Sequence, residues 1–385
     1  MEVSQVYSFV NSATSETIGN SVVLAEDLSN IVDVGAAIFN ANAFDKYVKS
    51  LVNRIGRTIF VNRPYSGSAP SVLMDSWEYG SVCMKIASEM PVAQENESWN
   101  LTDGTSYDPN VFHQPVVEAK FFNKMITFEI DRSITERQVK QSFSSPIELN
   151  AFISMLYNEV DKSLTVKMDS LIMRTINNMI AETVYDAFKG TEITGAGNTR
   201  AVNLLAKYNN SFGKTLTADK AIFDPEFIRY ASFEMGRVSK RMTKMSTLFN
   251  VGKKARFTPE NLLHVVMLSD FVSAASTYLY SDTFHENYLK LATAEQVPFW
   301  QGSGESYSFS DVSKVNLTKT ASGNAQEVSG ILCVMFDRDA LGVTNLDTRV
   351  TTNYNAKAEF TNYFFKRDAR YFNDFNENFV VFYVA

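Results

Sequence analysis

The feature that most constrains the fold is an uninterrupted helical pattern from residue 145 to residue 188. Ser145 can serve as the N-cap, Pro146 suits the first helical position, and Glu148 completes a capping box. Apolar side chains then recur every three or four residues and form one stripe: Leu149, Phe152, Leu156, Val160, Leu164, Met168, Leu171, Thr175, Met179 and Ile180. At about 1.5 Å per residue the helix would be roughly 65 Å long, so we expect it to act as a strut.

The composition describes an ordinary globular chain. With 385 residues, 45% of them apolar, we expect two or three structural units. A net charge of −7 disfavours nucleic acid as a partner held by the whole surface. Cys83 and Cys333 are too few for a disulfide framework. Because the first ten residues lack a basic segment and no apolar run approaches membrane length, we predict no signal peptide, no membrane contact and synthesis in a cytoplasm.

The first part of the chain is predicted to be an arm followed by a hairpin. Residues 36–59 have helical spacing and predict one helix, and Pro64 to Pro70 mark a boundary. The period then becomes two, and the apolar positions predict two arms of a long hairpin: Val82, Met84 and Ile86, then Ile126, Phe128 and Ile130.

The tip of that predicted hairpin is unusually long and acidic. It spans residues 88–110 and contains no Lys or Arg, and its acids are Glu89, Glu95, Glu97, Asp103 and Asp108. Connections inside a compact domain are normally about 4 to 6 residues long. The tip is therefore either a solvated loop or a flap that meets another subunit.

The remainder is predicted to be a mixed α/β unit followed by a ribbon. Residues 225–249 are predicted to be a helix with a basic face, which is either solvated or in contact with an acidic partner: Arg237, Lys240, Arg241 and Lys244. Residues 262–268 and 328–336 are predicted to be buried strands. Residues 349–354 and 360–371 predict a long antiparallel ribbon, and the apolar run 379–384 predicts a terminal strand inside a core sheet.

No stretch carries a convincing catalytic, cofactor or metal motif. Gly213, Lys214 and Thr215 resemble the end of a phosphate-binding loop, but Tyr208 stands where that loop needs glycine. The three histidines lack ligand spacing, so we predict no metal and no cofactor. A cytoplasmic enzyme that uses Asp337 or His264 in a cleft is the remaining alternative from the catalytic class.

The order of the parts is helical arm, flap hairpin, strut helix, α/β unit, ribbon and buried terminal strand. Together with the segments 336–343, 349–352 and 378–382, this order resembles the major capsid protein of tailed bacteriophages, which has the Hong Kong 97-type shell fold. The resemblance implies an α+β fold with an N-terminal arm, an E-loop hairpin, a long spine helix, a peripheral domain and an inserted axial domain.

The resemblance covers nearly the whole chain and implies its division. The implied parts are the N-terminal arm (1–60), the E-loop hairpin with flanking strands (61–143), the spine helix of the peripheral domain (144–190), the axial domain (191–335), the ribbon of the peripheral domain (336–374) and the terminal strand returning to the axial domain (375–385).

The function implied by the resemblance is a structural one, and no enzyme activity is expected. Copies of the chain would assemble into hexamers and pentamers of an icosahedral or prolate virion head, which would enclose double-stranded DNA without sequence-specific binding. A portal is also implied. Because no long charged segment precedes the arm, either a separate scaffolding protein is implied or such a segment was already removed, and Met1 at the start favours the separate protein. A cellular nanocompartment shell of the same fold is the alternative.

The acidic tip should then meet basic residues of a neighbouring subunit, because another acidic surface would repel it. One candidate set is Lys253, Lys254 and Arg256 in the α/β unit. The other is Lys366, Arg367 and Arg370 on the ribbon, which the geometry of the family favours.

Overall fold

The computed structural model describes residues 3–19, 24–26, 29–41, 43, 46–47, 50, 72–74, 83–88, 90–91, 93, 95–135, 137–138, 146–188, 195–280, 294–301, 308–318 and 325–385. Its helices are α1 (Val3–Ile18), α2 (Ile31–Asn40), α5 (Pro146–Phe188), α6 (Leu204–Phe212), α7 (Ala218–Ala221), α8 (Pro225–Met242), α9 (Ser269–Tyr280) and α10 (Phe309–Val312), with short 3-10 turns η3 (Glu97–Trp99) and η4 (Glu260–Leu262). None of the helices within these ranges combines the length and hydropathy needed to cross a bilayer.

The strands fall into two larger sheets and two hairpins. They are β1 (Leu73–Met74), β2 (Cys83–Ser88), β3 (Val117–Phe122), β4 (Met125–Thr135), β5 (Ala201–Asn203), β6 (Leu263–Leu268), β7 (Ala294–Val297), β8 (Val315–Thr318), β9 (Ala325–Val328), β10 (Ile331–Asp337), β11 (Leu341–Asn355), β12 (Phe360–Asn373) and β13 (Phe379–Tyr383). One sheet has the order β1-β11-β12-β4 and the other β5-β13-β10-β6-β7, while β2 pairs with β3 and β8 with β9.

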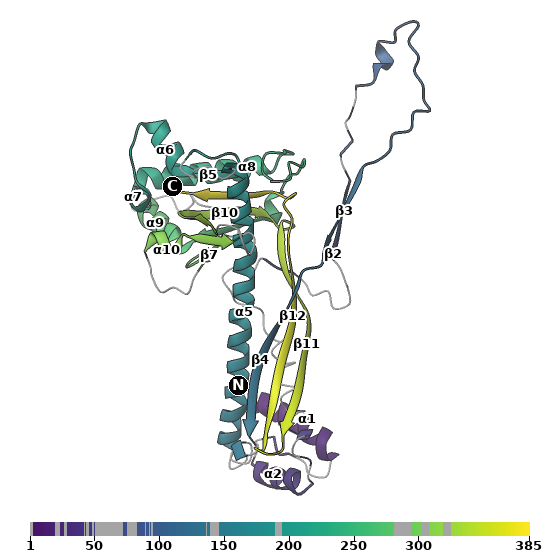
Figure 1. Ribbon diagram of the computed structural model, residues 1–385, viewed down its shortest axis with the longest axis vertical. Helices are drawn as coiled ribbons and strands as arrows, with labels where there is room; N and C mark the ends of the chain where they lie inside the picture. Colours follow the sequence, from purple (N-terminus) through teal and green to yellow (C-terminus); the bar gives the residue numbers. More distant parts are fainter. Residues whose placement is uncertain are drawn as a thin grey trace.

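Helix α5 is the single continuous helix that the sequence predicts, and it has 43 residues. It runs beside β4, β11 and β12 and ends within the α/β part of the molecule (Figure 1). Much of the predicted stripe is buried: Val160, Leu164, Met168, Leu171, Thr175, Met179 and Ile180. The proposed N-cap, Ser145, lies outside the described residues and stays a prediction.

The long sheet packs one face against α5. On β12 the side chains of Tyr363 and Phe365 are buried, and Tyr371 in the same alternating set accepts a 3.1 Å hydrogen bond from Arg174 of α5. On β4, Arg132 forms an ion pair with Glu159 of α5. The ribbon that the sequence predicts is therefore confirmed as β11 and β12, and β4 extends it into a wider sheet.

The five-stranded sheet forms the core of the α/β part. Two of its three inner strands, β10 and β13, are buried along their whole length, which confirms the predicted return of the C-terminal strand into a core. The predicted strand 328–336 is two elements instead of one. Gly330 separates them, because its φ is +74° and a Cβ there would lie 1.9 Å from the carbonyl oxygen of Val384.

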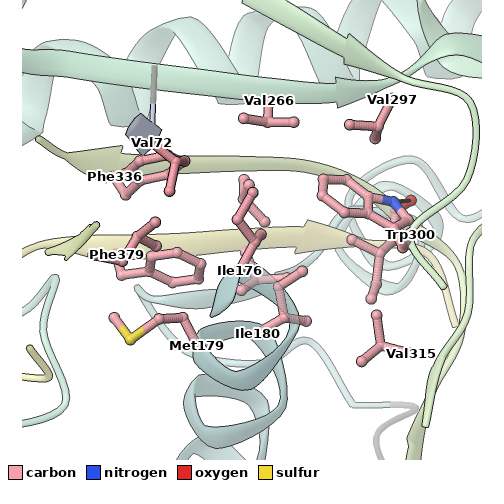
Figure 2. Packing of buried hydrophobic residues seen from close by; sticks show 14 of the residues in the cluster. Val72, Ile176, Met179, Ile180, Val266, Val297, Trp300, Val315, Phe336 and Phe379 are labelled. Carbon is pink, nitrogen blue, oxygen red and sulfur yellow. Dashed lines mark hydrogen bonds between the residues drawn. The ribbon is translucent and has the colours of Figure 1, made fainter. Parts of the chain in front are cut away.

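Each face of this sheet is covered. Helices α6, α8 and α9 cover one face, and the last turns of α5 cover the other together with Trp300 (Figure 2). Trp300 is fixed by two hydrogen bonds, since its Nε1 donates to the carbonyl of Ile331 at 2.9 Å and its own carbonyl accepts from Asn177 Nδ2 at 2.7 Å. Ile172 and Ile176, which lie outside the predicted stripe, are also fully buried because α5 contacts strands of both sheets.

Two predicted helices have different bounds. The helix expected at residues 36–59 begins at Ile31 and α2 ends at Asn40, and most of the rest of that prediction lies outside the described residues. The helix expected within residues 225–249 ends at Met242. Helix α1 was not predicted, because its sequence is polar and rich in small side chains, and burial of Val10 and Ala13 stabilises it instead.

We predict that Ile176→Ala will lower the free energy of unfolding by about 2 to 5 kcal/mol. The substitution would leave a cavity between α5 and the strands packed against it, and these elements cannot move together to fill it. Chemical denaturation of the isolated subunit measures this change. Lys167→Ala, at an exposed position of the same helix, should change the stability by less than about 0.5 kcal/mol. Equal effects of the two substitutions would contradict the two-sided packing of α5.

Candidate intersubunit surface

Strands β2 and β3, with the described residues of the connection between them, form a hairpin that projects away from both sheets (Figure 1). We call this segment the projecting hairpin and the two sheets with their helices the body. The sequence placed the second arm at residues 126–130, and this was wrong. Those residues belong to β4, which pairs with β12, and β2 pairs with residues 117–122 instead.

One face of the projecting hairpin is apolar and points away from the body. Met84 lies opposite Phe121, and residues directly opposite in an antiparallel pair share a face. The large side chains on this outward face, Met84, Ile86, Val117 and Phe121, are 53–64% exposed. An exposed run of large apolar side chains on adjacent strands is typical of a surface that another molecule covers.

The opposite face carries charged side chains that contact the body. Lys85 Nζ lies 2.7 Å from Glu377 Oε1 and 3.0 Å from Asp374 Oδ2. Lys120 Nζ lies 2.8 Å from Asp374 Oδ1. Arg256, in the loop after α8, places its Nε 3.1 Å from Glu377 Oε1. The two acids therefore join the hairpin to the body through Lys85 and Lys120, and Arg256 of the body adds a third cation at Glu377.

Electrostatics favours the charged form of these groups. Burial alone would raise the pKa of Asp374, but a hydrogen bond from Lys120 and the charge of Lys85 hold that pKa below its ordinary value. Burial would lower the pKa of Lys85, yet Glu377 and Asp374 raise it above its ordinary value. Ion pairing therefore outweighs desolvation for both partners.

Asp374 and Glu377 lie in the turn that connects β12 to β13. The backbone N–H of Asp374 donates to the carbonyl of Ala340 at 2.7 Å, and the N–H of Gly252 donates to the carbonyl of Phe375 at 2.8 Å. A Cβ at Gly252 would lie 2.0 Å from Asn376 Oδ1, so a larger residue there would displace the Asn376 side chain. The turn is consequently fixed from two sides before the hairpin contacts it.

The tip of the projecting hairpin is highly exposed. Glu95, Asp103 and Asp108 are exposed, Glu97 begins the 3-10 turn η3, and Glu89 lies outside the described residues. Trp99 and Phe112 are 94% and 82% exposed. The tip thus combines acids with large aromatic side chains. Contact of its acids with another subunit stays a prediction.

The three ribbon bases that the sequence nominates lie on two different faces of β12. Lys366 lies 2.9 Å from Glu129 of β4, on the face directed away from α5, and alternation places Arg370 on that same face. Arg367 alternates with them and lies on the face toward α5, where burial lowers its pKa to about 10. Of the three, Arg367 alone is therefore directed toward α5, and contact of Lys366 and Arg370 with another subunit stays a prediction.

The alternative set of bases contacts the hairpin of its own chain. Lys254 Nζ lies 3.3 Å from Glu118 of β3, and Arg256 pairs with Glu377 as described above. On the basic face of α8, Arg237 pairs with Glu234 and Lys240 with Glu260. Part of each basic set is thus neutralised within the chain.

The residues considered for catalysis do not form one site. His264 lies opposite Phe336 and its ring stacks on that side chain with 5.8 Å between centroids, whereas Asp337 lies opposite Leu263 on the other face of the sheet. Burial raises the pKa of Asp337 and lowers the pKa of His264. Within the part of the chain that the structure describes, no cluster of His, Cys, Asp and Glu is arranged to hold a metal ion.

Sequence reasoning missed the two-sided character of the hairpin stem. The segment 117–122 alternates apolar Val117, Ala119 and Phe121 with charged Glu118 and Lys120, and this signal was available. Only the pairing register shows that Met84 and Ile86 share the apolar face and Lys85 the charged one. Asp374 and Glu377 lie more than 250 positions after the lysines that they contact, so no local sequence pattern indicates these pairs.

Solved structures of similar architecture come from bacteriophages. A chain in the structure of head fiber and inner core protein gp22 of native bacteriophage P68 is 9% identical, with 84% of this chain and 86% of that chain covered and a TM-score of 0.50. A chain in the capsid structure of Staphylococcus phage Andhra is 10% identical, with 82% and 83% covered and a TM-score of 0.48. The first of these similarities supports a shared fold. No curated protein sequence matches the chain.

Comparison of the sequence with protein families identifies the family of this chain. Residues 7–383, and therefore both sheets, helix α5 and the projecting hairpin, match the Phi29-like phage major capsid protein family, which consists of structural proteins of the phage shell. The resemblance drawn from the order of the parts is confirmed at this level: the chain belongs to the Phi29-like phage major capsid protein family.

Proposed function

We propose that copies of this chain assemble into hexamers and pentamers of an icosahedral or prolate phage head that encloses double-stranded DNA. The chain would then reside in the virion after synthesis in the host cytoplasm. A portal and a separate scaffolding protein are part of the same proposal. The portal would let DNA enter the closed shell, and the scaffolding protein would direct the subunits to a shell of defined size. Membership in a capsid protein family supports the role as a shell subunit.

We assign the parts of the chain to a Hong Kong 97-type subunit. Residues 1–60 are the N-terminal arm, 61–143 the E-loop region and 144–190 the spine helix. Residues 191–335 are the axial domain, 336–374 the ribbon of the peripheral domain and 375–385 the terminal strand. The supporting features are α5 beside the β11–β12 ribbon and a C-terminal strand that joins the five-stranded sheet.

The observation that carries the proposal is the apolar outward face of the projecting hairpin. Because the charged face is directed toward the body, the chain's own body does not cover Met84, Ile86 and Phe121. Each Å² of apolar surface removed from water contributes about 25 cal/mol, so covering this face favours association. In a shell of identical copies the natural occupant is a neighbouring subunit, which places its own hairpin in the same way on the next.

The acidic tip adds selectivity to this contact. We propose that it meets the outer face of a neighbour's ribbon, where Lys366 and Arg370 lie. Lys366 already pairs with Glu129, so the incoming carboxylates would join an existing network. An exposed ion pair contributes only about 0.2 to 1 kcal/mol, but the same contact recurs at every subunit of the shell.

We predict that Phe121→Ser will prevent shell formation while leaving a folded subunit, because it removes the largest side chain of the outward face. Electron micrographs of purified wild-type protein should show closed particles, and the variant should sediment as a small species. The matched control is Val166→Ser on α5, where the valine is 65% exposed but lies outside the hairpin, and this variant should assemble. Normal particles from Phe121→Ser would show that the outward face of the hairpin is not part of the interface between subunits.

Reversing the charge of Glu95 and Asp103 to Lys should slow assembly and reduce its dependence on salt, because repulsion would replace attraction at the tip. Light scattering during assembly measures the rate. Circular dichroism should be unchanged, since both side chains are exposed in the free subunit. Assembly at the wild-type rate with the wild-type salt dependence would mean that the tip is a solvated loop.

The free subunit should not shift DNA in a gel at about 150 mM salt, because the chain carries a net charge of −7 and its DNA is expected to be held by confinement. Purified particles from infected cells should nevertheless contain DNA. Particles that hold protein cargo and no DNA would favour a nanocompartment shell, and a tight, salt-sensitive complex of the subunit would make the basic face of α8 a DNA site.

A further inference from the structure

The contact between the projecting hairpin and its own body includes a network of ion pairs. This network consists of Lys85 and Lys120 on the hairpin and of Asp374, Glu377 and Arg256 on the body, and we call these five residues the latch. We propose that the latch is a positioning device, which fixes the direction of the hairpin in the free subunit so that its apolar face is presented to an incoming copy. The part of this inference that concerns assembly rests on the proposed function.

At the β3–β4 connection, which the structure describes, the covalent link alone does not set the direction of the hairpin. Only Asn123 and Lys124 separate β3 from β4, and these strands belong to different sheets. A two-residue link between strands leaves backbone torsions that can pivot the hairpin as a unit. Besides the latch, Phe122 contacts Phe372 with ring centroids 5.1 Å apart and Glu118 pairs with Lys254. Both contacts lie on the same side of the stem as the latch.

The latch acids are preorganised and need their cations. The side chain of Asp374 is 2% exposed, and its backbone and that of Phe375 are fixed by hydrogen bonds to Ala340 and Gly252. A buried carboxylate without a cation is strongly destabilised, so Asp374 favours the hairpin position that brings Lys85 and Lys120 to it. Glu377 is held in turn by Arg256 and receives Lys85 as its second cation.

The position of these acids links the hairpin to both sheets. Asp374 follows the last residue of β12 in the long sheet, and Glu377 precedes the first residue of β13 in the five-stranded sheet by two positions. Lys85 contacts both acids, and its Nζ also lies 3.4 Å from the carbonyl oxygen of Asp339 after β10. The direction of the hairpin is therefore defined relative to the two sheets at once.

The latch should remain closed throughout the neutral range. The groups that face Asp374 are Lys85 and Lys120, and those that face Glu377 are Lys85, Arg256 and the buried Asp337. Because the pKa of Asp374 is lowered, its stabilisation is present above the ordinary pKa of Asp and is lost as the pH falls through the lowered value. The raised pKa of Lys85 extends the closed range upward.

The test measures the hairpin in the isolated subunit, where assembly plays no part. Spin labels are attached to Ser88→Cys on the hairpin and Ser273→Cys on α9, both exposed positions, in a Cys83→Ser background, and Cys333 is buried. In the otherwise unchanged chain we expect one narrow distance distribution between about pH 5 and pH 9. Asp374→Asn should broaden it. An unchanged distribution in that variant would overturn the latch.

A second variant tests the same proposal if Asp374→Asn does not fold. Lys120→Gln changes only the hairpin side of the latch and should also broaden the distribution, whereas Lys124→Gln, at an exposed lysine four positions along, should not. Equal distributions for Lys120→Gln and Lys124→Gln would likewise overturn the proposal.

Assembly of the unlabelled variants tests the consequence. Lys120→Gln should assemble at least about tenfold more slowly than Lys124→Gln, which corresponds to about 1.4 kcal/mol of lost preorganisation. A broadened distribution with unchanged assembly would show that the latch holds the hairpin without serving assembly. Failure of the wild-type chain to form shells would contradict the proposed function, while the label distances would still decide the existence of the latch.

Discussion

The packing of α5 between two sheets is the constraint on which the rest of the structure depends. Most of the stability of a helix in a protein comes from tertiary packing, so the 43 residues of α5 need partners for their apolar side chains. The ribbon supplies them beside the helix, and the five-stranded sheet supplies them at its C-terminal end, where Ile172, Ile176 and Ile180 are all fully buried. Because the same helix enters both cores, neither sheet can shift without disturbing the other.

A rigid body of this kind allows a hairpin with an unusual distribution of side chains. In a free-standing soluble protein the apolar face of a strand pair is directed toward the core and its charged face toward water. In the projecting hairpin the charged face contacts the body and the apolar face is exposed. This arrangement is unfavourable for an isolated molecule and favourable for a component of a larger assembly, where the exposed face is covered by another copy.

The parts that could be predicted from the sequence are those whose signals are local. The helical repeat of α5, the buried run of β13 and the ribbon of β11 and β12 each depend on residues close together in the chain, and each is confirmed. The pairing of β4 could not be predicted in the same way. Phe128 lies opposite Arg367, and no pattern within residues 125–135 distinguishes that partner from the nearer strand at residue 84. The candidate surface was predicted only in part for the same reason. The acids of the tip are close together in the sequence and could be recognised, whereas the apolar and charged faces of the stem depend on how β2 pairs with β3.

The use of charge at the base of the hairpin follows from the apolar character of its other face. If both faces were apolar, the stem could pack against the body in either of two orientations, and hydrophobic contact would not discriminate between them. Lys85 and Lys120 pair with Asp374 and Glu377 in the observed orientation, and burying them without such partners would carry a large desolvation penalty. The ion pairs therefore contribute less to net stability than to the choice of face. By fixing which side of the hairpin meets its own subunit, they leave Met84, Ile86 and Phe121 for the next one.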